Sequence, residues 1–144
     1  MFVRRCAAGC LVVLLSFASC ACLGGSTPHT PEEAAVIAAI KGYAPHGTEL
    51  SYALAMALRK SGYPEAAIRE HVFESDDAGW VCFPDEEDGT WIAEFSWKYS
   101  NESVVFSFSY DTASGGVGGA NANGTCLVRQ LDEDCVDCVC TSQP

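Results

Sequence analysis

Basic side chains are scarce in this sequence. It has 8 lysines and arginines against 19 aspartates and glutamates, and its formal net charge is −11 at pH 7. Because proteins bind DNA and RNA by neutralising phosphates with Lys and Arg, we expect no nucleic-acid partner. The same shortage excludes a basic face that would hold the chain on anionic lipid. Attachment to a membrane would therefore need a lipid group or an apolar segment.

Sequence motifs of several common enzyme classes are missing as well. The chain has no Gly-x-Ser-x-Gly nucleophile motif, no His-Glu-x-x-His zinc motif and no Walker phosphate-binding loop. The 3 histidines, His29, His46 and His71, are far apart in the sequence. We therefore identify no catalytic residue and no cofactor from the sequence, and these absences favour a protein that is not an enzyme.

Near the start of the chain, Arg4 and Arg5 are followed by an apolar run and then by small residues. This N-terminal region has no acidic residue. This order is typical of a secretory signal peptide. We expect residues 1–19 to be removed on export and the mature protein to be extracytoplasmic, in the cell envelope or secreted. An uncleaved membrane anchor is the competing interpretation, because the uncharged run from Cys6 to Leu23 approaches the length that spans a bilayer.

The end of this signal, Phe17-Ala18-Ser19-Cys20, resembles the lipobox of prokaryotic lipoprotein precursors, with Phe17 where Leu is usual. In that family the cysteine after the cleavage site is acylated and becomes the new N-terminus. The resemblance, which covers the signal alone, implies a lipid anchor on Cys20, with Cys22 as the alternative. A tether at 20–31, a single domain at 32–130 and a Cys- and Asp-rich tail at 131–144 would follow.

The first half of the mature chain is predicted to be helical. Thr30, Pro31 and Glu33 form a capping-box pattern at the start of the first helix. Thr48 is a candidate cap for the second helix. The predicted helices run from Pro31 to a stop at Gly42, from Glu49 to Ser61, and from Pro64 to about His71.

The second half changes to the two-residue period of β-strands. Apolar side chains alternate with mainly polar ones in two runs joined by a short polar turn, which predicts a hairpin. The predicted strands are Gly79–Phe83, Trp91–Tyr99, Val104–Tyr110 and Thr125–Gln130. The sequence thus predicts an α+β fold, with two to three N-terminal helices packed on a small antiparallel sheet of three to four strands.

Residues 111–124 consist mostly of Gly, Ala, Ser and Asn. A phosphate-binding loop would need the N-terminus of a helix behind these glycines. Because a strand is predicted to follow, we interpret the segment as a flexible connection. The aromatic residues on the strands are interpreted mainly as core, with a ligand groove as the alternative. Asn101-Glu102-Ser103 and Asn123-Gly124-Thr125 match glycosylation sequons in predicted turns.

Cysteines carry most of the recognisable chemistry. Outside the cytoplasm, clustered cysteines usually form disulfides. We therefore expect disulfides among five of them: Cys82, Cys126, Cys135, Cys138 and Cys140. A bridge between Cys82 and Cys126 across the sheet is one possible pairing.

Two other uses of the cysteine cluster stay open. Cys126, Cys135, Cys138 and Cys140 would supply four thiolates for a zinc ion, with no metal site as the leading expectation. A redox pair at Cys135 and Cys138 is disfavoured because the surrounding carboxylates would raise the thiol pKa. We expect an exported, lipid-anchored binding or interaction module whose partner is an envelope protein or another extracytoplasmic component. A zinc-binding protein is the alternative.

Overall fold

A computed structural model describes residues 29–74, 77–135 and 140 of the chain. The predicted signal peptide, the candidate lipidation sites Cys20 and Cys22, most of the predicted tether and Cys138 lie outside the described residues. The helical elements are α1 (Pro31–Lys41), α2 (Leu50–Lys60), α3 (Glu65–Ile68), the π-helix η1 (Arg69–Glu74) and α4 (Ala122–Asp132). The strands are β1 (Trp80–Pro84), β2 (Thr90–Tyr99), β3 (Glu102–Asp111) and β4 (Gly116–Gly119).

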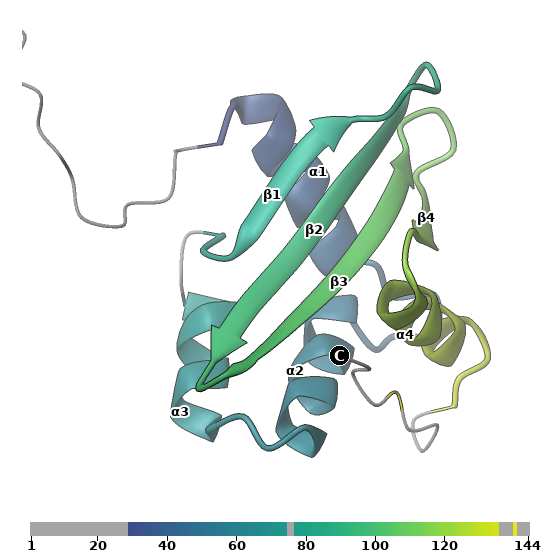
Figure 1. Cartoon of the computed structure of the whole chain (residues 1–144). Helices are drawn as coiled ribbons and strands as arrows, with labels where there is room; N and C mark the ends of the chain where they lie inside the picture. Colours follow the sequence, from purple (N-terminus) through teal and green to yellow (C-terminus); the bar gives the residue numbers. More distant parts are fainter. Residues whose placement is uncertain (1–28, 75–76, 136–139, 141–144) are drawn as a thin grey trace, which may run out of the picture.

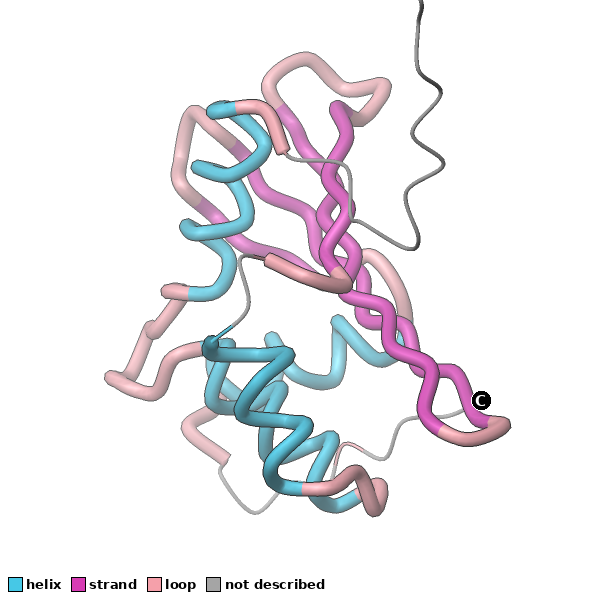
Figure 2. The backbone as a smooth tube through the Cα atoms, turned by 90° about the vertical axis from the view of Figure 1, so that its left-hand side faces the viewer, coloured by secondary structure: helices cyan, strands magenta, loops and turns pink. Residues whose placement is uncertain are grey.

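The predicted α+β class is confirmed, because helices pack on one antiparallel sheet with the strand order β1-β2-β3-β4. Each strand pairs with the next one along the chain, and the central β2–β3 hairpin is the longest pair. Figure 1 shows this meander with α1 crossing behind it. In Figure 2 the described helices lie on one side of the sheet, so the other face carries no helical cover from these residues.

The N-terminal helices form largely where the sequence places them. The Thr30 hydroxyl accepts from the Glu33 amide, and the Glu33 carboxylate accepts from the Thr30 amide, so the predicted capping box is present. Gly42 is the C-cap of α1, as expected. The predicted cap of the second helix is wrong: Glu49 is the N-cap of α2, and it makes no side-chain capping bond.

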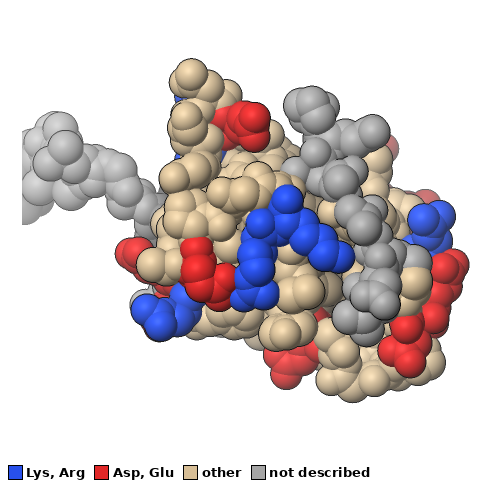
Figure 3. All heavy atoms as spheres, turned by 90° about the horizontal axis from the view of Figure 1, so that it is seen from below, with Lys and Arg blue, Asp and Glu red and all other residues tan. Residues whose placement is uncertain are grey.

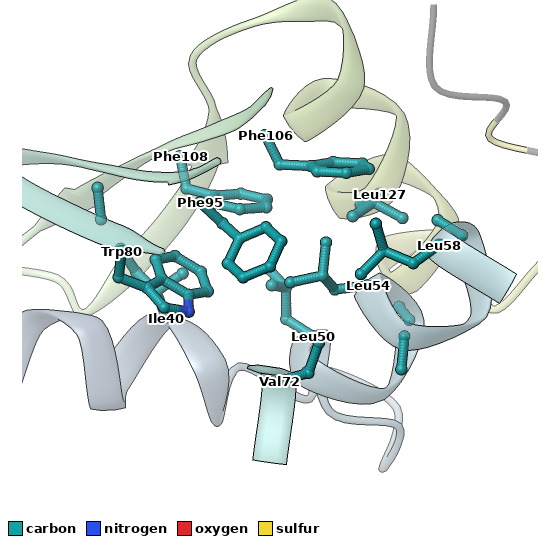
Figure 4. Packing of buried hydrophobic residues seen from close by; sticks show 14 of the residues in the cluster. Ile40, Leu50, Leu54, Leu58, Val72, Trp80, Phe95, Phe106, Phe108 and Leu127 are labelled. Carbon is teal, nitrogen blue, oxygen red and sulfur yellow. The ribbon is translucent and has the colours of Figure 1, made fainter. Parts of the chain in front are cut away.

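Large apolar side chains from the sheet and the helices meet in one core. Phe95, Phe106 and Phe108 are at most 1% exposed and extend from the helix-facing side of β2 and β3. Figure 4 shows them packed against leucines of α2 and α4 and against Trp80 of β1. Burial of such side chains is the main favourable contribution to folding. The alternating residues in the middle of β2 and β3 are thus core residues, as the period predicts, whereas Trp91 and Tyr110 are half-buried and Tyr99 is exposed.

The fourth strand was predicted in the wrong place. Residues 125–130 belong to the helix α4, and β4 forms earlier, at Gly116–Gly119. The Asn121 side chain accepts from the Gly124 amide and starts α4. Leu127, Val128 and Leu131 then face the core at helical spacing. Thr125, Cys126 and Val128 favour a strand locally, but tertiary packing and the Asn121 cap outweigh that preference.

The start of α4 also completes the outer edge of β3. The Asn121 carboxamide accepts from the Ser107 amide at 3.1 Å and donates to the Val105 carbonyl at 3.0 Å. Asn123 donates to the same carbonyl at 2.9 Å. A Cβ at Gly124 would lie only 2.0 Å from the Ser107 carbonyl oxygen, so the helix approaches β3 this closely because position 124 is glycine.

No described helix is long and apolar enough to cross a membrane.

We predict that Asn121→Ala lowers the free energy of unfolding by about 2–3 kcal/mol, because it removes a helix cap and leaves the buried Ser107 amide unpaired. Asn123→Ala is the matched control, since Asn121 still donates to the Val105 carbonyl, and it should cost about 1 kcal/mol. Urea unfolding followed by circular dichroism measures both. Equal losses for the two variants would contradict this role of Asn121.

Candidate functional site

The cysteine tail is tied to the last helix. Cys126 on α4 forms a disulfide with Cys140, with the two Cα atoms 5.8 Å apart and a sequence separation of 14. Cys140 is 4% exposed and belongs to the hydrophobic core, so the bridge ties this position of the tail into the domain. Cys135 is disulfide-bonded as well. The expected disulfides of Cys126, Cys135 and Cys140 are therefore present.

The expected disulfide of Cys82 is wrong. Cys82 is a buried free thiol on β1, and Cys126, its suggested partner, is bonded to Cys140. Cys126 lies on a helix and not on a neighbouring strand, so the assumption behind a bridge across the sheet fails. Burial, with a smaller contribution from the Glu33 carboxylate, raises the pKa of the Cys82 thiol to about 11. Cys82 is thus a core side chain with little thiolate at neutral pH.

The four thiolates of the zinc alternative are not brought together in this state. Cys126 and Cys140 are bonded to each other and Cys135 is in a disulfide. A sulfur in a disulfide is not a thiolate and does not bind zinc in that way. Within the described ranges, no group of three or more His, Cys, Asp or Glu side chains is placed to hold a metal ion.

The three histidines lie at separate places. His29 is 3.7 Å from the Glu33 carboxylate, and His46 Nε2 is 3.0 Å from the Asp132 carbonyl. The His71 ring stacks on Trp97 with a centroid distance of 4.4 Å, and its Nδ1 is 3.1 Å from the Ala67 carbonyl. The structure therefore places the histidines in local packing and hydrogen bonding and does not join them in one site.

The glycine-rich segment is followed by a helix, contrary to the sequence prediction. A helix N-terminus therefore follows the glycines, as a phosphate cradle would require, but the start of α4 faces β3. The Asn121 carboxamide occupies the Gly124 amide, and Gly124 packs directly on the Ser107 carbonyl. The Asn123 sequon is also bound internally through its donation to Val105. The asparagines of this segment thus hold the domain together.

A groove between α1 and the sheet is the strongest candidate site. It encloses about 380 Å³, within the volume range of small-molecule sites. One wall is formed by side chains of α1 that recur at helical spacing. The floor is the aromatic pair Trp91 and Tyr110, which lie directly opposite each other on β2 and β3. The lining residues are Glu32, Ala35, Val36, Trp91, Tyr110 and Thr112.

The groove lies beside the first turns of α1, and α1 is shorter than the strands it covers. Eleven helical residues span about 16 Å, whereas the ten-residue strands β2 and β3 span about 33 Å. Trp91 and Tyr110 therefore sit at the end of the sheet and stay half-buried, while Phe95 and Phe108 further along are fully covered. The alternation of apolar residues reveals which face these aromatics occupy, but not where the helical cover ends.

Negative charge gathers around the groove. Glu32 is the one charged residue in the described lining, and none of the lining residues is basic. The amide and hydroxyl of Thr112 both donate to the Gly89 carbonyl, which brings the exposed acidic turn at 85–88 beside it. A hydrogen bond from Ser114 and the Ala113 amide hold the pKa of Asp111 below its usual value.

Positive charge lies mostly at the opposite end of the domain. Arg59 and Lys60 occupy the last turn of α2. Figure 3 views the molecule from that end, and Lys and Arg side chains gather near the middle of the face. Arg59 and Arg69 pair with Glu65 and Glu74 there. The domain thus has an acidic end, which carries the groove, and an end where the basic residues are concentrated.

Comparisons with protein-family models, with curated proteins and with solved structures found no match. The interpretation of the site therefore depends on the geometry of this chain alone.

We predict that removing the Cys126–Cys140 bridge lowers the free energy of unfolding by about 3 kcal/mol, because the cross-link closes a loop of this length in the unfolded chain. The Cys126→Ala/Cys140→Ala double variant tests this by urea unfolding. Each single variant already breaks the bridge, so the single and double variants should lose similar stability. Small and additive losses would show that the bridge contributes little.

We predict that iodoacetamide does not label Cys82 in the folded protein at about pH 8, because its thiol is buried and its pKa is raised to about 11. Labelling should become complete when the protein is unfolded in urea without reductant. Mass spectrometry of the Cys82 peptide measures both states. Equally fast labelling in the folded and unfolded protein would mean that β1 is not packed as described.

Proposed function

We propose that this chain is an exported protein of the cell envelope, anchored by a lipid on Cys20, whose α+β domain acts as a binding module outside the cytoplasm. The signal, the lipobox-like segment and the tether expected at 20–31 motivate export and anchoring. Cys22 is the alternative site of acylation.

The disulfide between Cys126 and Cys140 is the observation that supports this proposal most strongly. Disulfides form and persist in extracytoplasmic compartments, whereas thiols in the cytosol are kept reduced. The bridge joins α4 to Cys140, which is buried in the core, so an oxidised state would stabilise the folded domain. A domain that works after export would gain this stability.

A binding role is supported by the groove at the acidic end of the domain. It combines an aromatic floor, an apolar wall and a carboxylate, a combination that is common in ligand sites. The tether would enter α1 at the same end, because Glu32 of the groove lies two residues after the Thr30 cap. A module anchored in this way would present the groove to components of the envelope.

Mass spectrometry of the native, unreduced protein from membranes tests the export proposal. We expect a mature chain that begins at an acylated Cys20 and contains the Cys126–Cys140 bridge. Cys20→Ala should abolish acylation and membrane attachment, while the matched variant Cys22→Ala should keep both.

Two results would overturn the proposal. A cytosolic chain with Met1 intact and free thiols would exclude export. Stoichiometric zinc bound to reduced Cys126, Cys135, Cys138 and Cys140 would support the zinc-binding alternative instead, and elemental analysis of the same sample detects it. Acylation at Cys22 alone would move the anchor without changing the rest.

A further inference from the structure

We propose that the groove between α1 and the sheet binds a small alkylated ammonium ion. This inference gives the binding module a ligand class, and so it deepens the proposed function. It depends on the folded domain alone, and its test does not require export or acylation.

The floor of the groove is aromatic. Trp91 and Tyr110 are cross-strand neighbours that both line the groove and remain half-buried. A cation near the face of Trp or Tyr is attracted by the negative π-surface, and quaternary ammonium groups are characteristic ligands of such aromatic sites. The half-buried state leaves part of each ring accessible to a ligand.

The charges around the groove complement a cation. Glu32 supplies a carboxylate at the rim, the acidic turn at 85–88 lies beside Thr112, and no described lining residue is basic. Because charges of one sign around a concave, apolar surface strengthen the local potential, this end of the domain favours cations over anions. The basic side chains that would offset this potential gather at the other end of the domain (Figure 3).

The apolar walls of the groove favour one kind of cation. A primary ammonium is strongly hydrated and needs acceptors for its three donors when it leaves water. The walls at Ala35 and Val36 are apolar, and the side-chain acceptors of the described lining are the Glu32 carboxylate and the hydroxyls of Tyr110 and Thr112. An alkylated ammonium has few or no N–H donors to satisfy, so this groove suits it better.

The experiment titrates choline and its uncharged isostere 3,3-dimethylbutan-1-ol into the purified mature protein with its disulfides intact. Calorimetry gives the affinities, and amide chemical shifts in NMR locate the site. We expect choline to bind about tenfold more tightly than the isostere, because only choline has the cation–π and carboxylate attractions. The shift changes should centre on Trp91, Tyr110 and the first turns of α1.

Two pairs of variants test the position of the ligand. Ala35→Leu fills the groove from an exposed position of α1 and should weaken choline binding by about tenfold or more, whereas Ala38→Leu, also exposed on the same helix, should leave it unchanged. Glu32→Gln should weaken binding by about two- to fivefold, and the remote control Glu70→Gln should not.

The inference is overturned if choline does not bind, if the isostere binds equally well, or if Ala35→Leu keeps full affinity. Trp91→Phe retains an aromatic ring and gives a milder second test, with an expected intermediate affinity for choline. A negative titration on the disulfide-bonded protein would reject this ligand, while acylation detected separately by mass spectrometry would leave the proposed export and anchoring in place.

Discussion

The second half of the fold depends on the hydrogen bonds of the Asn121 side chain. One carboxamide accepts from Ser107 and Gly124 and donates to Val105, so it starts α4 and completes the edge of β3 at the same point. Without it, the Ser107 amide of β3 would be unpaired where β4 has already ended. Because α4 is fixed here, Leu127 and Leu131 reach the core and Cys126 is placed to bond Cys140.

The placement of the helices determines which parts of the sheet stay accessible. α2 and α4 cover the middle of the aromatic face, where the phenylalanines are fully buried. The first turns of α1 lie beside Trp91 and Tyr110, which stay half-buried. This arrangement leaves a carboxylate from the first turn of α1 beside two aromatic rings.

The sequence predicts correctly those helices and strands that are determined by neighbouring residues. The capping box at Thr30 and the two-residue alternation of β2 and β3 depend on neighbouring residues, and both are present in the structure. α4 and β4 depend on distant partners. Gly116–Gly119 has little preference for a strand and becomes one by pairing with β3, while α4 starts through Asn121 contacts with residues 14 to 16 positions earlier.

The candidate site follows the same division. The composition of the cysteine tail indicates disulfides, but the pairing of Cys126 with Cys140 and the free thiol of Cys82 depend on where the helix and the strand lie in space. Trp91 and Tyr110 are recognisable as residues of the helix-facing side, yet their partial exposure depends on how the helices lie over this end of the sheet. A sequence pattern therefore predicts which face of the sheet a residue occupies, but not whether a helix covers that residue.

The charge distribution links the groove to the proposed anchor. If Cys20 is acylated, the roughly ten residues before Thr30 extend at most about 35 Å, so the acidic end of the domain stays near the membrane. Anionic headgroups would repel the turn at 85–88 and Glu32. This repulsion would keep the groove away from the lipid surface and open to the solution. The same negative charge would draw cations from the headgroup region toward the groove. The acidity of the chain would thus repel the anionic membrane surface and attract a cationic ligand.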